Sequence, residues 1–183
     1  MSLKINVLFL VKEHFLTLKH DGTGKISFTD LFSFVALPIF LSGATIFFEV
    51  KLSADFTDAV INFGAIFSAL LMSVLVLVYD QDAKLNDVIQ KAENNSKAIN
   101  KVNLGLKKEL LKQLYHNICF AIVASLSIVV LSLVQILAES YKWIFVSTWI
   151  ITPFIIFFLC SMILTTLMVV KRMHALLESN IHQ

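Results

Sequence analysis

Four long apolar stretches, separated by polar segments, set the pattern of the chain. The uncharged windows cover residues 31–48, 59–79, 117–138 and 143–170. A membrane-spanning helix needs about 20 apolar residues to cross about 30 Å of hydrocarbon, so each window predicts one span. The first window is short, and the fourth is long enough that we expect it to tilt or to project at its ends. Pro38 and Pro153 each remove a backbone hydrogen bond and are expected to kink their helices.

The polar segment between the second and third windows has a helical pattern of its own. Its apolar residues recur at three- and four-residue spacing, at Leu85, Val88, Ile89, Ala92, Ile99, Val102, Leu106 and Leu110. This spacing places them on one helical face. A break is expected at residues 93–96, where Asn suits a helix end and Ser96 can cap the next helix. Residues 80–116 therefore predict a helical hairpin that extends the second and third spans by about 20–30 Å.

The amino-terminal arm, residues 1–30, begins with a second amphipathic pattern. The apolar residues of segment 3–18 that share one face are Leu8, Val11, Phe15 and Leu18. Lys12 and Lys19 fall on another face, which predicts a helix that lies at the membrane interface or packs on the bundle. No cleavable signal peptide is expected, because charged residues follow the apolar run.

The sequence HDGTGKISFTD, residues 20–30, resembles two kinds of ligand loop. A phosphate-binding loop needs four residues between its first glycine and the Gly-Lys pair, and the spacing here is shorter. A calcium loop with Gly24 at its sixth position would place Lys19 at the first, where a carboxylate is required. We therefore expect no nucleotide or calcium site. The segment predicts a turn, with Ser27 capping the first span and Asp30 stabilised by the helix dipole.

Composition indicates an all-α integral membrane protein. Of the 183 residues, 57% are hydrophobic and 15% are charged, and the mean hydropathy is +0.80. A soluble domain is about 45–50% apolar and about 25% charged. Five Gly and two Pro are too few for the many tight turns of an all-β chain. We predict a four-span bundle at residues 31–170, which includes the hairpin, followed by a cytoplasmic tail at residues 171–183.

The distribution of basic residues predicts the orientation of the chain. The arm, the hairpin and the tail contain all of the 15 basic residues except Lys51 and Lys142. Since basic residues in short loops mark the cytoplasmic side, both termini and the hairpin are predicted to be cytoplasmic. The loop before the second span is acidic, with Glu49, Asp55 and Asp58. It is either an ordinary solvated loop or a ring of carboxylates at the mouth of an oligomeric pore.

The sequence contains no recognisable reactive constellation. The five histidines are dispersed, no catalytic motif occurs, and the windows contain none of the charged residues that mark a transport pathway. Cys119 and Cys160 lack metal-ligand spacing and are expected to be packing residues. Asn62 and Gln135 are expected to hydrogen-bond between helices. We therefore predict no enzyme activity, secondary transport, catalytic residue, cofactor or metal site.

The hairpin surface suggests a protein partner, a lipid partner, or both. Its apolar positions outnumber those that one helix–helix seam can bury, so the excess is expected at an oligomer or partner interface. The candidate interface residues are Leu85, Ile89, Ile99, Val102, Leu106 and Leu110. Lys107, Lys108 and Lys112 lie close enough to the membrane to meet anionic lipid headgroups. Direct nucleic-acid binding is not expected, because the hairpin has no Arg and only one aromatic residue, Tyr115.

The arm and the topology together resemble one family. The residues that carry the resemblance are Lys12-Glu13-His14-Phe15, Thr17-Leu18, Asp21-Gly22-Thr23-Gly24-Lys25, Asp30-Leu31 and Leu37-Pro38, followed by four spans and a hairpin. The pattern is similar to the KwaA family, the small four-span membrane subunits of the Kiwa anti-phage defence system. The resemblance implies an inner-membrane oligomer that senses phage attack and holds a cytoplasmic DNA-binding effector, KwaB, at the membrane.

Two functional interpretations follow. The first is a non-enzymatic sensor and scaffold in the bacterial inner membrane. Its partners would be the lipid bilayer, further copies of the chain (a tetramer is expected) and a cytoplasmic protein effector. The second is a small channel or membrane-disrupting pore of four or more copies, which hydroxyl groups in the uncharged spans would permit. Those hydroxyl-bearing residues are Ser125, Ser127, Ser132, Thr165 and Thr166.

Overall fold

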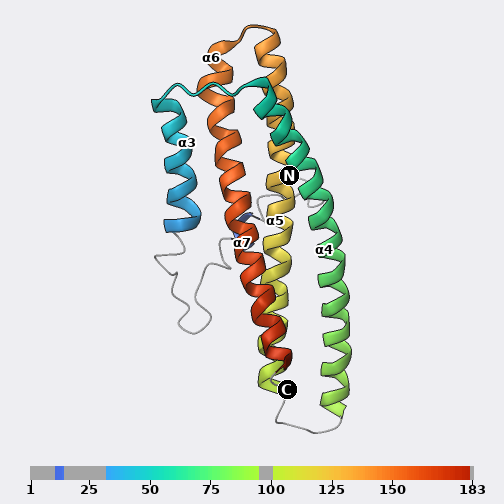
Figure 1. The fold of residues 1–183 in the computed structure, drawn as a ribbon. Coiled ribbons are helices and arrows are strands. Elements are labelled where there is room, and N and C mark those ends of the chain that lie inside the picture. The colour runs from blue at the N-terminus through green and yellow to red at the C-terminus, as the bar shows by residue number, and fades with distance from the viewer. Residues whose placement is uncertain (1–10, 15–31, 95–100, 182–183) are drawn as a thin grey trace.

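The computed structural model describes residues 11–14, 32–94 and 101–181, and almost all of them are helical (Figure 1). The elements are η1 (Phe32–Ala36), α3 (Leu37–Phe47), α4 (Ala54–Asn94), α5 (Lys101–Ser140), α6 (Ile144–Val146), η3 (Ser147–Ile151) and α7 (Thr152–Ile181). Both η elements are π-helical turns, and residues 11–14 form a separate helical turn, here the His14 turn. No strand occurs within these ranges, so the predicted all-α class is confirmed.

The helices stand in a row in the order α3, α7, α5, α4 (Figure 1). α4 packs on α5, α5 packs on α7, and α7 packs on α3, so α5 and α7 form the central pair. Large apolar side chains are nevertheless exposed along the row, among them Phe40, Leu77, Leu137 and Leu167. Exposed apolar surface of this extent marks contact with a membrane or with other proteins.

Three helices are long and apolar enough to cross a membrane: Ala54–Lys91, Leu104–Ser140 and Ile144–His174. The first predicted span forms a shorter apolar helix, Phe32–Phe47. At 1.5 Å per residue its length is about 24 Å, which is less than the hydrocarbon thickness of about 30 Å. Three membrane-length helices therefore fit the sequence prediction, and the first predicted span, at residues 31–48, stays a prediction.

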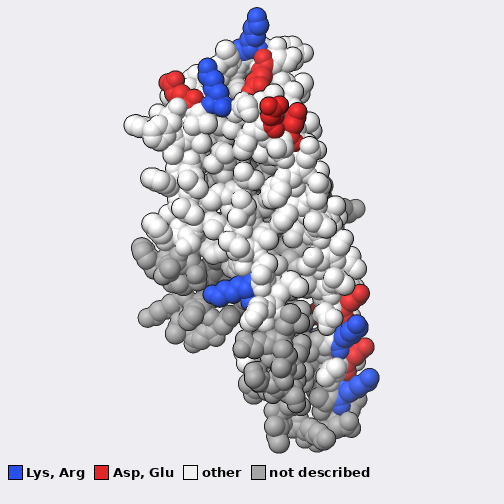
Figure 2. Space-filling view, in the orientation of Figure 1, with Lys and Arg blue, Asp and Glu red and all other residues white. Residues whose placement is uncertain are grey.

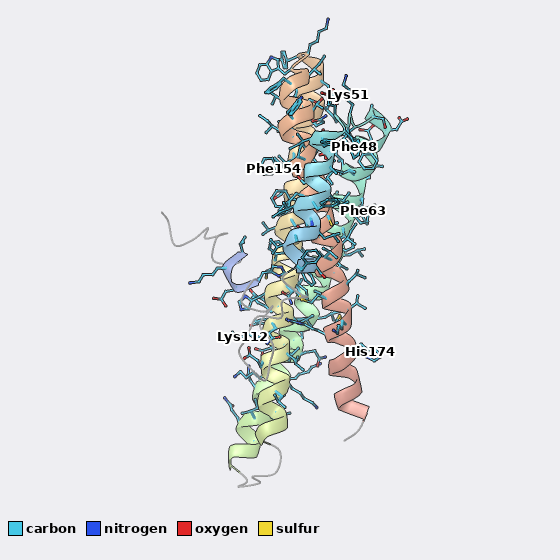
Figure 3. All side chains as sticks on the ribbon, turned by 90° about the vertical axis from the view of Figure 1, so that its left-hand side faces the viewer. Phe48, Lys51, Phe63, Lys112, Phe154 and His174 are labelled. Carbon is cyan, nitrogen blue, oxygen red and sulfur yellow. The ribbon has the colours of Figure 1, made fainter. Side chains whose placement is uncertain are left out.

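Charged side chains gather near the two ends of the helices, and an uncharged band lies between them (Figure 2). Figure 3 places Lys51 at one end, and Lys112 and His174 toward the other. A band without charges, built from helices with exposed apolar side chains, fits the hydrocarbon layer of a bilayer. Which end faces the cytoplasm stays a prediction.

The two prolines disturb their helices in the same way. η1 ends two residues before Pro38, and η3 ends two residues before Pro153. Since proline cannot donate the backbone hydrogen bond of an α-helix, the preceding turn has lost one donor, and a wider π turn accommodates the loss. The Thr152 hydroxyl donates to the Ser147 carbonyl oxygen across the second of these turns, at 3.0 Å. Each proline is therefore preceded by a local π turn, and a kink of the helix axis at either proline stays a prediction.

The ends of α4 and α5 cover most of the predicted hairpin segment, residues 80–116, and the cytoplasmic hairpin itself stays a prediction. α4 ends at Asn94, inside the predicted break, and α5 begins at Lys101, so the helices continue without interruption from the uncharged band into the polar segment. The predicted tail continues α7 as a helix to Ile181. Ser96, Ile99 and the arm segments 3–10 and 15–30, which include the predicted turn, lie outside the described residues.

Candidate functional sites at the two ends of the row

The structure separates the predicted interface residues of the hairpin into two groups. Leu85, Ile89 and Leu110 are half-buried, and Leu85 packs against the core that contains Leu111. By contrast, the Leu106 side chain is 57% exposed. Ile99 lies outside the described residues, and Val102 lies in α5, but its side chain is not described. Part of the predicted apolar face of the hairpin therefore packs between α4 and α5.

A second exposed apolar residue accompanies Leu106. Val88, on α4, is 50% exposed. The end of α7 near His174 diverges from the α4–α5 hairpin in Figure 3, so it does not cover the whole hairpin. Of the predicted lipid-contacting lysines, Lys108 and Lys112 are exposed and Lys107 is half-buried. The hairpin therefore presents isolated apolar side chains among charged ones.

The outer face of the hairpin part of α4 carries alternating charges (Figure 2). The exposed residues that form this pattern are Asp80, Lys84, Asp87 and Lys91. An acidic residue four positions before a lysine stabilises a helix by about 0.2–0.5 kcal/mol, so this pattern supports a solvent-facing helix. The mixed signs make a surface suited to another protein more than to a uniformly negative polymer.

The His14 turn packs on the central helix α5 near the lower end of the uncharged band. His14 is 2% exposed, and its ring stacks on Phe120 of α5 with ring centroids 4.0 Å apart and planes 2° from parallel. Its Nδ1 lies 2.8 Å from the Asn117 amide oxygen, which can only accept, so Nδ1 carries the proton and donates. The contact links residues 103 positions apart and anchors the turn to α5.

Burial and a neighbouring charge both disfavour the protonated form of His14. Removal of the imidazole from water is the larger effect, the hydrogen bond with Asn117 opposes it, and the positive charge of Arg172 on α7 adds to it. Together they lower the pKa of His14 to about 4 from its ordinary value of about 6.5. His14 is therefore neutral in its docked position at neutral pH.

Sequence reasoning treated His14 as one of five dispersed histidines and missed this site. The amphipathic pattern of segment 3–18 placed Val11 on the apolar face, but the structure leaves Val11 half-buried and buries His14. The available signal was that His14 follows Val11 by three residues and therefore lies on the same helical face. Only the fold shows that Asn117 and Phe120 meet it there.

A second polar cluster lies where α5 meets η3. Gln135 is 1% exposed, and its amide nitrogen donates to the Ser147 hydroxyl at 2.6 Å and to Glu139 at 2.8 Å. The predicted hydrogen bond between helices is therefore confirmed for Gln135. Asn62 is exposed on α4, and its hydrogen bond to another helix stays a prediction.

The hydroxyl groups considered as pore-lining mostly bond to their own helices. Ser125, Ser127, Thr165 and Thr166 donate to backbone carbonyl oxygens three or four residues earlier, at 2.8 Å. Ser132 is fully buried, and its hydroxyl has no hydrogen-bond partner within the described ranges. This arrangement is typical of helix packing in a membrane, where local bonds satisfy polar side chains.

The α3–α7 contact leaves an apolar groove of about 420 Å³. Ser42 on α3 donates to the Pro153 carbonyl oxygen at 2.9 Å and ties the two helices together beside it. The groove is lined by Ile39, Gly43, Ile46, Trp149, Phe154 and Phe157 with Ser42, Ile150 and Pro153. These side chains match acyl chains of lipid and offer little to a polar substrate.

Metal-binding groups do not come together in the described ranges, where no group of three His, Cys, Asp or Glu side chains could hold an ion. Cys119 and Cys160 are free thiols and are half-buried. Both positions fit the expected role in packing.

Fold and sites together define a class: an all-helical protein with three membrane-length helices and an amino-terminal turn packed on α5. A comparison with protein families, curated proteins and solved structures finds no match for the chain. The resemblance to KwaA therefore stays a prediction from the sequence.

Proposed function

We propose that the chain is a non-enzymatic sensor and scaffold subunit of a bacterial anti-phage complex in the inner membrane. It oligomerises there and holds a cytoplasmic effector, similar to KwaB, at the membrane. The observation that carries the proposal is the continuation of α4 and α5 beyond the uncharged band, with Val88 and Leu106 exposed on the extension. The resemblance of the arm to KwaA supplies the anti-phage role.

Burial of these two side chains is sufficient to influence assembly. Complete removal of a fully exposed Val or Leu side chain from water contributes about 1.5–3 kcal/mol, and since each of these two is about half exposed, burial of the remainder contributes about 1.5–3 kcal/mol for the pair. A difference of 1.4 kcal/mol changes an equilibrium constant tenfold. The surrounding charges keep the extension soluble and allow a partner to be selected by charge pattern.

The same observations favour a scaffold over a channel. A pore would need polar groups directed at a common path, whereas four of the five candidate hydroxyls bond to their own helices. The exposed carboxylates Glu49, Asp55 and Asp58 lie in and beside the short connection between α3 and α4. They fit a solvated loop as well as a pore mouth.

The proposal predicts that Val88→Asp combined with Leu106→Asp leaves membrane insertion intact, because both residues lie outside the uncharged band. The pair should lower the oligomeric mass or release the effector, and should abolish protection of cells against phage. Native mass spectrometry from mild detergent measures mass and partner together. The matched control is Gln81→Ser with Gln90→Ser, which changes exposed uncharged residues on the same part of α4. If the double aspartate variant keeps its mass, its partner and protection, the hairpin is a connector and the proposal is wrong.

A further inference from the structure

The groove between α3 and α7 runs along both helices and has a definite length. Ser42 of α3 bonds to Pro153 of α7 near its middle. Because α3 and α7 are antiparallel (Figure 1), Trp149 lies near the end of the groove where α3 finishes, and Phe157 lies toward the opposite end. The stretch from Trp149 to Phe157 is about 12 Å long at 1.5 Å per residue. This is close to half of the hydrocarbon thickness of about 30 Å, so the groove has the depth of one bilayer leaflet.

The lining of the groove is apolar and partly uncovered. Ile39, Trp149, Ile150 and Phe154 are 42–56% exposed, although each belongs to an uncharged window of the sequence. A Cβ atom added at Gly43 would have no heavy atom within 4 Å, so open space lies over this part of the lining. The volume of about 420 Å³ falls within the range of about 300–1,000 Å³ that is typical of ligand pockets. In a membrane this opening faces hydrocarbon.

Polar groups indicate which end of an amphipathic occupant lies where. The Ser42 hydroxyl donates its proton to the Pro153 carbonyl oxygen and offers no donor to an occupant. The Trp149 indole lies near the charged end, where tryptophan is typically found between hydrocarbon and headgroups, and an indole N–H there suits a lipid ester. Glu49 and Lys51, exposed in the connection after α3, offer one charge of each sign to a zwitterionic headgroup. Figure 3 shows Lys51 beyond the groove, toward that end of the helices.

We propose that the α3–α7 groove binds one acyl chain of a zwitterionic phospholipid, with its headgroup at the Trp149 end and its chain directed toward Phe157. A helix with its side chains is about 10–12 Å across, so a helix of a second copy could insert only single side chains. An acyl chain is slender enough to follow the groove over its whole length. Since α3 is the edge helix and packs mainly on α7, the bound chain adds apolar contact where the row has least. The proposal does not depend on the scaffold function.

The test uses the two tryptophans of the chain as reporters, because only one of them lines the groove. Trp143→Phe leaves Trp149 as the emitter, and Trp149→Phe leaves Trp143, which is 62% exposed. Each full-length protein, delipidated in mild detergent, is titrated with phosphatidylcholine brominated in one acyl chain, since bromine quenches indole fluorescence on contact. Quenching of Trp149 should saturate at one lipid per chain, whereas quenching of Trp143 should follow the lipid fraction of the micelle without saturation. Equal, unsaturated quenching of both residues overturns the proposal.

A variant that fills the groove gives a second, independent measurement. Gly43→Leu places a side chain in the open space, so in the Trp143→Phe background it should abolish the saturable quenching. The matched control is Phe40→Leu, which changes an exposed apolar residue of α3 outside the lining and should keep the saturation. Saturable quenching that survives Gly43→Leu overturns the proposal. If Trp149 is not quenched in the parent and Gly43→Leu lowers the oligomeric mass, a second copy occupies the groove and the proposal is wrong. The comparison of the two tryptophans needs no change at Gly43 and decides alone if that variant does not fold.

Discussion

At the scale of residues, two buried polar side chains show how the chain tolerates polarity inside an apolar row. His14 stacks on an aromatic ring and donates to an amide, and Gln135 uses both amide protons, one for Ser147 and one for Glu139. In each case a bond to a distant element replaces the bond to water that burial removes. Polar residues of this kind fix which helices meet and in which register.

The Gln135 bonds predict a measurable loss of stability when they are removed. Gln135→Leu leaves the Ser147 hydroxyl without its amide donor, so the free energy of unfolding should fall by about 1–2 kcal/mol. Ser132→Ala is the matched control one turn earlier on α5. Its hydroxyl has no partner in the described part of the chain, and the change should stay within about 0.5 kcal/mol. Unfolding by SDS in mixed micelles measures both, and equal effects would contradict the assigned role of Gln135.

At the scale of elements, α4 and α5 approach each other closely at one glycine, Gly64. A Cβ atom added at Gly64 would lie 2.9 Å from Val129 Cγ2 and 3.2 Å from the Ser125 carbonyl oxygen. Small residues let membrane helices approach closely, and the gain in packing compensates for the helix propensity that glycine lacks. The contact at Gly64 sets the distance between the first two long helices.

Gly64→Ala is therefore expected to destabilise the protein although alanine is the better helix former. Overpacking costs about 1–3 kcal/mol, because the backbone oxygen of Ser125 can move only with α5. The control is Gly105→Ala, where nothing lies within 4 Å of the added Cβ, and a gain of up to about 1 kcal/mol is expected. The SDS unfolding assay applies again. Two variants that gain stability equally would show that α4 and α5 pack less closely than described.

At the scale of the whole molecule, the helices form a single row, and the charged side chains lie near both ends of the helices. Lys51 stands on one side of the uncharged band, and Lys112 stands toward the other (Figure 3). Lys142 lies in the connection that follows α5. The two faces of the row and its edges, α3 and α4, expose apolar side chains. Lipid or further copies of the chain would cover them in a membrane.

The positive-inside rule predicts which side of the membrane each end occupies. A single cysteine at Lys91, in a chain that carries Cys119→Ala and Cys160→Ala, should resist membrane-impermeant thiol reagents in intact cells. A single cysteine at Lys142 should react readily. Permeabilised cells provide the control, since both positions should then react. Labelling at residue 91 but not at residue 142 in intact cells would reverse the proposed orientation.

Sequence reasoning reached the helical class, the long apolar helices and the helix end at Asn94, because these depend on local pattern. Apolar periodicity and the rarity of glycine and proline act within one segment, so they can be recognised without knowing its neighbours. The prolines likewise indicated where the helices would depart from regular geometry. The second, third and fourth predicted spans have the expected length. The first predicted span stays a prediction, because the helix Phe32–Phe47 is shorter.

What the sequence alone determined is therefore the chemistry of each segment: which stretches can lie in hydrocarbon, which must meet water, and where a helix ends. Only the tertiary structure decided the order of the row and the partners of its buried polar groups. Stacking of His14 on Phe120 joins residues more than a hundred positions apart. The division of the predicted interface residues into half-buried Leu85 and exposed Leu106 depends on how α4 faces α5. The physical reason is that periodicity gives the face of a helix, whereas the residue opposite that face is set by packing between helices.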